Sequence, residues 1–117
     1  MKAPFISANH CHCEQCRKEH GALSAAYGVI LKSDLEWTSG KKRVRKFASS
    51  ERGRRGFCKD CGSTVYFYHK DHPNHIEIPL GLLDCEPSVT PQCHIHVDSK
   101  PSWSEITDDL PQYPQGH

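Results

Sequence analysis

The fold class is decided by residues 57–69, which read Phe-Cys-Lys-Asp-Cys-Gly-Ser-Thr-Val-Tyr-Phe-Tyr-His. Two cysteines, Cys58 and Cys61, precede Gly62, which tolerates a positive φ and so permits a tight turn around a metal. The β-branched and aromatic run that follows directly is typical of a strand. A redox cysteine pair of the thioredoxin type would instead need a βαβ setting. We therefore interpret Cys58 and Cys61 as a zinc knuckle, half of a structural four-cysteine site, in a β protein.

Patterns on either side of this stretch predict a chain of short elements. Alternating or β-rich segments predict strands at residues 25–32, 35–38, 43–48, 75–80 and 93–97, and residues 15–21 predict a turn or two of helix. The polar, glycine-containing residues 49–56 predict a loop, and eight prolines disfavour any long helix. We expect a mainly β fold, a single small zinc-binding domain of short antiparallel strands with zinc-knuckle turns. It should span residues 1–117, with an irregular lead at 1–9 and a C-terminal tail at 104–117.

A second cysteine motif occupies residues 11–16, Cys-His-Cys-Glu-Gln-Cys. Its three thiolates lie close enough in the chain for a tight turn to wrap them around one tetrahedral ion. Three ligands leave the fourth position open, as in catalytic zinc sites. We predict that Cys11, Cys13 and Cys16 bind metal and form the catalytic site. The alternative is a cluster of reduced cysteines without metal.

The composition limits the number of domains, the redox state of the cysteines and the cellular compartment that we expect. With 117 residues and 36% hydrophobic content, the chain makes one domain with a modest core that gains from a metal staple. The seven cysteines and nine histidines are zinc-ligand types. The odd cysteine count disfavours a disulfide framework, and no apolar run has the length of a signal peptide or membrane span. We therefore expect a cytoplasmic protein with no membrane partner.

The remaining candidate residues have two interpretations each. Cys85 and Cys93 are either small buried hydrophobes or ligands, and His94 and His96 are either polar strand residues or a metal clasp. His10, His12 and His20 lie near the first cysteine run in the sequence. Each could be a proton shuttle, a fourth metal ligand or a plain solvated side chain. The basic residues of 41–55 either grip carboxylates or phosphates, or form a solvated face. Because the net charge is only +1, nucleic acid is not an expected partner.

The motifs together resemble a known family from about residue 10 to the end. The matching segments, in order, are Cys11–Gly21, Phe57–Ser63, Gly81–Asp84, His94–Ile95, Ser99–Lys100, Trp103 and Asp108–Pro111. This series is similar to the glutathione-dependent formaldehyde-activating enzyme family, which also includes centromere protein V. The resemblance implies a mainly β fold with two zinc sites, one structural with four cysteines and one with three cysteines and an open position.

Carried over by position, Cys11, Cys13 and Cys16 would hold the catalytic zinc, and Cys58 and Cys61 would be half of the structural site. The family normally has an earlier C-x-C strand that completes the structural site, but Met1 to Asn9 contains no cysteine. We therefore expect one or two zinc ions per chain. Cys58 and Cys61 could also join Cys11 or Cys13 in one shared four-sulfur site. At residues 99–103 the chain reads Ser-Lys-Pro-Ser-Trp, where the family has Ser-Lys-Ala-Pro-Trp.

The activity that the resemblance implies is that of a carbon–sulfur lyase, S-(hydroxymethyl)glutathione synthase, which joins glutathione to formaldehyde. Zinc would hold the thiol substrate as thiolate. Arg52, Arg54, Arg55 and Lys100 are candidates to bind the carboxylates of glutathione. Two alternatives are a non-catalytic zinc-binding structural or interaction module and a thiol sensor in which Cys58 and Cys61 oxidise to a disulfide.

Overall fold

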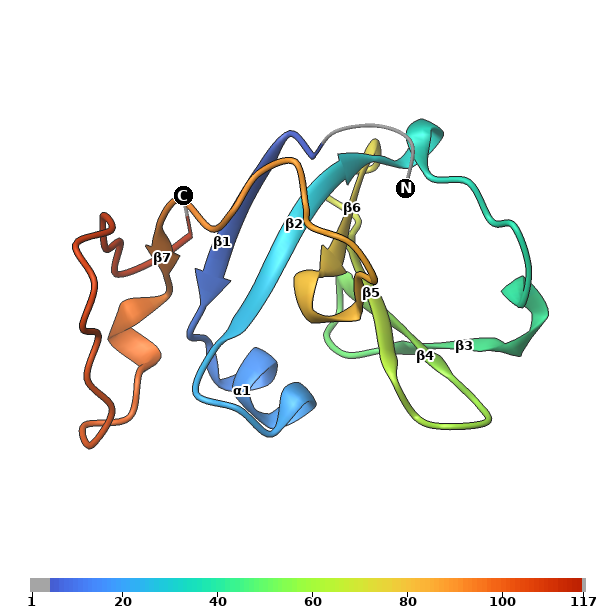
Figure 1. Ribbon diagram of the computed structural model, residues 1–117. Coiled ribbons are helices and arrows are strands. Elements are labelled where there is room, and N and C mark those ends of the chain that lie inside the picture. Colours follow the sequence, from blue (N-terminus) through green and yellow to red (C-terminus); the bar gives the residue numbers. More distant parts are fainter. Residues whose placement is uncertain (1–4, 117) are drawn as a thin grey trace.

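The computed structural model describes residues 5–116, and these form a seven-stranded mixed sheet (Figure 1). The strands are β1 (Ser7–Cys11), β2 (Ala25–Leu31), β3 (Val44–Ala48), β4 (Gly53–Cys58), β5 (Thr64–His69), β6 (His75–Pro79) and β7 (His94–Ile95). Their order across the sheet is β3-β4-β5-β6-β2-β1-β7. The described residues add one α-helix, α1 (Glu14–His20), and short 3-10 turns at Lys32–Asp34, Lys41–Arg43, Leu80–Leu82 and Val97–Ser99. The predicted mainly β fold is confirmed.

Strand direction departs from the expectation at one edge. The strands pair antiparallel except β1 and β7, which run parallel. A parallel pair needs a long connection, and here the chain travels through β2 to β6 before it returns beside β1. The expectation of antiparallel strands throughout is therefore wrong for this pair.

Three local predictions are corrected. The loop expected at 49–56 ends at Gly53, where β4 begins, because β3 and β5 supply hydrogen-bonding partners on both sides. Residues 35–38 form no strand. The strand expected at 93–97 is only His94–Ile95, because His96 turns into the left-handed region with φ 55°.

The two ends of the described chain are more ordered than expected. The irregular lead at 1–9 is wrong for Ser7 to Asn9, which belong to β1, and Phe5 is buried; residues 1–4 lie outside the described residues. The C-terminal segment runs beside β7 (Figure 1), where the His94 N–H donates to the Pro111 carbonyl at 2.8 Å.

Each face of the sheet carries its own buried cluster. Because side chains alternate along a strand, residues two apart share a face. One face carries Ile30, Ile76 and Ile78, which pack with Phe5. The opposite face carries Cys11, Ala25 and Tyr27, against which Phe67 and Ile95 pack. The second face is the one that holds the cysteine run.

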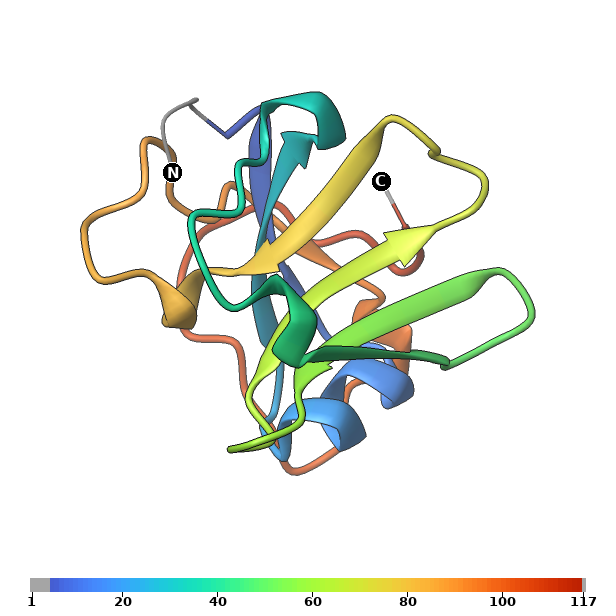
Figure 2. The ribbon, with the colours of Figure 1, turned by 90° about the vertical axis from the view of Figure 1, so that its right-hand side faces the viewer.

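Gly28 shows how closely the first face is packed. A Cβ atom at this position would lie 2.5 Å from Cδ1 of Phe5 and 2.9 Å from Cδ2 of Leu80. The absence of a side chain at Gly28 therefore lets the Phe5 ring pack directly against β2. Figure 2 shows α1 at the opposite end of the sheet from the β5–β6 turn.

Candidate metal centre

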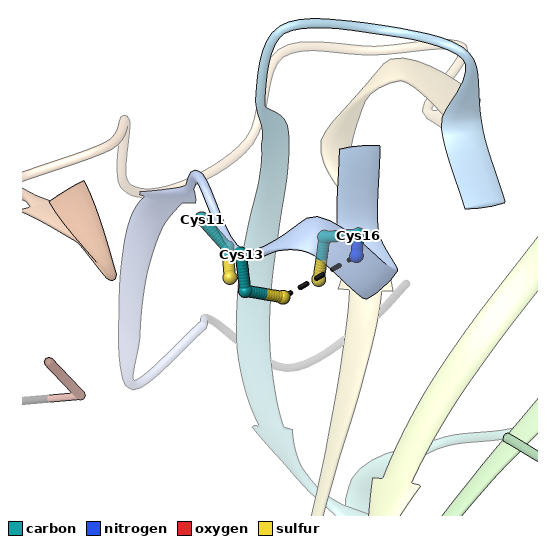
Figure 3. A group of neighbouring side chains, drawn as sticks. All are labelled: Cys11, Cys13 and Cys16. Atoms are coloured by element: carbon teal, nitrogen blue, oxygen red, sulfur yellow. Dashed lines mark hydrogen bonds between the residues drawn. The ribbon is translucent and has the colours of Figure 1, made fainter. Parts of the chain in front are cut away.

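The end of β1 and the start of α1 bring three cysteines together. Cys11 ends β1, Cys13 is the N-cap of α1, and Cys16 lies in its first turn. The Cys16 N–H donates to Cys13 Sγ at 3.3 Å, so a sulfur fills the capping role that Ser or Asp usually has. Gly21, with φ 60°, ends the helix after only seven residues. Figure 3 shows the three sulfurs gathered between strand and helix.

The donor set fits zinc. The three sulfurs all lie within 4.8 Å of one another. Zinc–thiolate bonds of about 2.3 Å in a tetrahedron put sulfurs about 3.8 Å apart, so only a small adjustment is required. Cys11 and Cys16 are buried and Cys13 is partly exposed. The arrangement offers three soft ligands and leaves the fourth direction to a further ligand.

Hydrogen bonds among the three sulfurs decide which thiol ionises most readily. Hydrogen bonds from Cys11 and Cys16 lower the pKa of Cys13, and the bond to Cys13 raises the pKa of Cys11. Of the two, Cys13 therefore takes the thiolate form more readily, and it lies at the helix N-terminus, where the helix dipole also favours an anion. Thiolate is the form in which cysteine binds metal.

A buried arginine balances this charge. Arg55 of β4 is only 2% exposed, and its Nη2 lies 3.6 Å from Cys16 Sγ. Its Nη1 donates to the Tyr27 hydroxyl at 2.9 Å, and its guanidinium stacks on Phe67 with 4.7 Å to the ring centroid. A buried guanidinium needs a counter-charge, and here the anionic sulfur cluster supplies it.

Tyr27 and His20 hold the arginine in place. Because Arg55 can only donate, the Tyr27 oxygen accepts from it. The same hydroxyl lies 2.7 Å from His20 Nε2 and donates to this nitrogen in the His20 tautomer that carries its proton on Nδ1. Burial, followed by the charge of Arg55, lowers the pKa of His20 and keeps it neutral for this role. His20 is therefore a hydrogen-bond partner of Tyr27.

The other cysteine pair lies apart. Cys58 and Cys61 flank the turn between β4 and β5, where Gly62 has φ 77° and its N–H donates to the Cys58 carbonyl at 2.8 Å. The Ser63 hydroxyl lies 3.2 Å from Cys61 Sγ, and hydrogen bonding to it lowers the pKa of this exposed thiol. Within residues 5–116, neither cysteine joins a group of three ligand side chains. The knuckle turn is formed, but the structure does not bring it to the first cluster.

A histidine–carboxylate network lies at the β1–β7 edge. Asp108 accepts from His94 Nε2 at 3.0 Å, which leaves His94 Nδ1 to accept from His12 Nε2 at 2.8 Å when His94 is neutral. His10 stacks on His94 with ring centroids 4.8 Å apart. His10, His94 and Asp108 are close enough to consider as metal ligands. Both nitrogens of His94 are already engaged, so the group serves to tie the C-terminal segment to β1.

Of the two interpretations left open for His94 and His96, the metal clasp does not form among the described residues. His94 is buried in the network described above, whereas His96 begins the 3-10 turn that follows β7. His12 is 4% exposed, and its Nδ1 has no hydrogen-bond partner in the described part of the chain. Burial is the main cause that lowers the pKa of His12, to about 4.

A cavity of about 600 Å³ opens on the same sheet face. Phe67 and Ile95 line it and also pack against the cysteine cluster, so cavity and cluster share a wall. Glu77 of β6 contributes a carboxyl group, and His69, His72 and His75 line the end near the β5–β6 turn. The volume is typical of a small-molecule site.

The basic residues expected to bind carboxylates are occupied elsewhere. Arg55 serves the cysteine cluster, and Arg52 pairs with Asp71 at 2.5 Å. Arg54 donates to the Ser50 carbonyl at 3.1 Å, and Lys100 donates to the Ser104 carbonyl at 2.6 Å. None of the four lines the cavity.

Comparison with known proteins places the chain in a family. The sequence model of the glutathione-dependent formaldehyde-activating enzyme family matches residues 1–99. The chain belongs to this family. A Schizosaccharomyces pombe protein described as an uncharacterized lyase is 33% identical over 101 residues, covering 86% of this chain and 70% of that protein. A crystal structure of a Rhodobacter sphaeroides protein shares the fold, with TM-score 0.59 and 20% identity over 74% of this chain and 76% of that one.

Membership of the formaldehyde-activating family confirms the resemblance read from the motifs. At family level the function is a glutathione-related, formaldehyde-activating one of lyase type. The family binds zinc and acts on small molecules, and the cysteine cluster of this chain could hold such an ion. No helix among residues 5–116 is long and apolar enough to cross a membrane.

Sequence reasoning missed the residues around the cluster. Glu77 alternates with Ile76 and Ile78 in β6, a pattern typical of a solvent-facing polar side, and only the assembled sheet shows that a cavity covers it. Tyr27 lies in the apolar strand β2, where nothing in the sequence marks it as a partner of Arg55. The sequence predicts for Arg55 either a solvated face or a contact with the carboxylates of glutathione, and neither interpretation includes its contact with Cys16. One signal was present: Arg55 follows a second arginine in a segment with glycines on both sides, which is also compatible with a buried strand.

Proposed function

We propose that this protein is a zinc-dependent, carbon–sulfur lyase-type enzyme that joins a thiol to an aldehyde, with glutathione and formaldehyde as the pair. Cys11, Cys13 and Cys16 would hold the zinc. The observation that supports the proposal is the convergence of these three sulfurs within 4.8 Å of one another, with a cavity sharing a wall with them. Family membership supports the choice of substrates.

When bound, zinc would lower the pKa of the thiol and hold it as a thiolate at the position that the three cysteines leave open. Addition of the thiol to formaldehyde would form the C–S bond from the sulfur lone pair, and the C=O π pair would move to oxygen. That oxygen takes up one proton, which balances the proton that the thiol lost. Atoms and charge balance, and the product is S-(hydroxymethyl)glutathione.

The residues of this chain prepare the cluster for that chemistry. Arg55 offsets the negative charge of the cysteine thiolates through Cys16. Tyr27 fixes the guanidinium, and Phe67 covers it. The cap geometry of α1 orients Cys13 and Cys16 toward one another. A rigid cluster reduces the reorganisation needed when a thiol binds.

The test must separate enzymatic from spontaneous addition, because formaldehyde and thiols react without help. Exchange NMR of glutathione and formaldehyde at equilibrium measures the interconversion rate directly. We expect the zinc-loaded protein to accelerate exchange over buffer and Cys16→Ser to abolish the acceleration. Cys85→Ser, at an exposed cysteine outside the cluster, is the matched control and should retain it.

Equal exchange rates with and without zinc-loaded protein would contradict the proposal. If that protein nevertheless binds zinc and gains stability from it, the non-catalytic zinc-binding module becomes the better description.

A further inference from the structure

The cavity beside the cysteine cluster has an unusual charge pattern. Its lining contains no lysine or arginine among the described residues, and Glu77 is its one carboxylate. The other ionisable lining side chains are His69, His72, His75, Cys93 and Tyr113. A ligand carboxylate would find no fixed positive charge here, whereas a ligand cation would find Glu77.

Glu77 itself has no direct partner. Within residues 5–116, no hydrogen bond or ion pair to this carboxylate is formed; Arg55 and Cys13 act on it only through space. Burial raises the pKa of Glu77 to about 7, with Arg55 opposing and Cys13 adding to the effect. A half-buried carboxyl group that opens into a cavity without a cation is suited to receive one.

The sheet register places Glu77 relative to the cluster. Glu77 pairs with Phe67, which in turn pairs with Arg55, and all three side chains share a face. Arg55 reaches back to Cys16. In the strand order β6 lies between β5 and β2, so Glu77 shares the sheet face of Phe67 and Tyr27, which pack with the sulfur cluster. A ligand in this cavity can therefore meet Glu77 on the side of the sheet that carries the cysteines.

We propose that Glu77 binds the protonated amine of the thiol substrate, so that the site selects aminothiols over thiols without a positive charge. This rests on the function proposed above and specifies its substrate. Recognition would come from the ammonium group of glutathione, and not from its carboxylates as the sequence suggested.

The test compares glutathione with N-acetylglutathione, which lacks the ammonium charge and keeps the thiol. Cobalt-loaded protein reports thiol binding through its thiolate-to-metal absorption band, so affinity is read without any turnover. We expect glutathione to bind about 10-fold tighter, the effect of one charge-assisted hydrogen bond. Glu77→Gln should remove this preference, and the control Glu51→Gln, at an exposed position, should keep it.

Three outcomes would overturn the inference in distinguishable ways. Equal binding of both thiols by the wild-type protein rejects amine recognition and leaves the metal–thiol function intact. A preference that persists in Glu77→Gln assigns the amine to another residue. No change of the absorption band with either thiol rejects the proposed function together with the inference.

Discussion

Arg55 illustrates how much a single side chain depends on its neighbours. It stands among basic residues in the sequence, yet it is 2% exposed and contacts Cys16 and Tyr27. A buried guanidinium is costly to leave without a counter-charge. The cysteine cluster and Arg55 therefore stabilise each other. A substitution of Arg55 should alter metal binding by the cysteines, and a substitution of the cysteines should destabilise the buried guanidinium.

Replacing this arginine should weaken metal binding. We expect Arg55→Met, which keeps length and removes charge, to lower zinc affinity about 10- to 100-fold, the usual cost of losing a hydrogen bond to a metal ligand. Competition with a chromophoric chelator measures the affinity. Arg54→Met, on the opposite face of the same strand, is the control. Unchanged affinity in Arg55→Met would show that the guanidinium does not support the thiolates.

Glu77 should make stability depend on pH. Its folded-state pKa of about 7 lies above the ordinary value, so stability is fully present below the unfolded pKa and is lost as pH rises through the folded pKa. We expect Glu77→Gln to be more stable than wild type at pH 8 by roughly 3 kcal/mol. The difference should close below about pH 4.5.

Urea unfolding of metal-loaded protein across this pH range gives the free energies. Glu51→Gln should follow the wild-type curve. A Glu77→Gln curve parallel to wild type at every pH would mean that the carboxyl group is better solvated than its burial indicates.

At the scale of elements, β2 is the strand that contributes a buried side chain to the cluster on each face of the sheet. It carries Tyr27 on the cysteine side and Ile30 on the opposite side, both 2% exposed or less. Gly28 lies between them and receives the ring of Phe5. The strand therefore couples the packing of residues near the start of the described chain to the sheet centre.

A side chain at Gly28 should disturb this contact. We expect Gly28→Ala to lower the free energy of unfolding by about 1–3 kcal/mol, because the new methyl group would overlap Phe5 and Leu80. Gly81→Ala is the matched control, since a Cβ there meets no atom within 4 Å. Thermal unfolding checks both. Equal midpoints for the two variants would mean that Phe5 moves aside without cost.

At the scale of the molecule, the two faces of the sheet should respond differently to loss of metal. The cluster around Ile30 and Ile76 contains no cysteine. By contrast, α1 has seven residues, well below the ~12–15 that an isolated helix needs, and depends on Cys13 and Cys16 for its start.

Chelation should therefore loosen the helix before the sheet. We expect hydrogen exchange of the α1 amides to rise on zinc removal, while slow amides in β2 and β6 stay protected. Mass spectrometry or NMR resolves the two regions. Simultaneous loss of protection in all three elements would instead show that the metal holds the whole domain together.

Local patterns predicted most elements because the signals were local. The β-branched and aromatic run 64–69 is β5, and 15–21 overlaps α1. β4 was missed because Arg54 and Arg55 look like loop residues until β3 and β5 supply hydrogen bonds. β7 was overestimated because nothing in the sequence announces the left-handed turn at His96.

The sequence by itself determined the three-cysteine run, the knuckle turn and the mainly β class, because ligand spacing and strand periodicity are properties of a few neighbouring residues. Only the tertiary structure decided that Arg55 serves the cluster, that Glu77 faces a cavity and that Cys58 and Cys61 lie apart from Cys11, Cys13 and Cys16. All three facts depend on strand order and register. Together these place side chains of β4, β5 and β6 on the same sheet face as the cysteine at the end of β1. Pairing between distant strands is set by the packing of the whole sheet, and no short stretch of sequence encodes it.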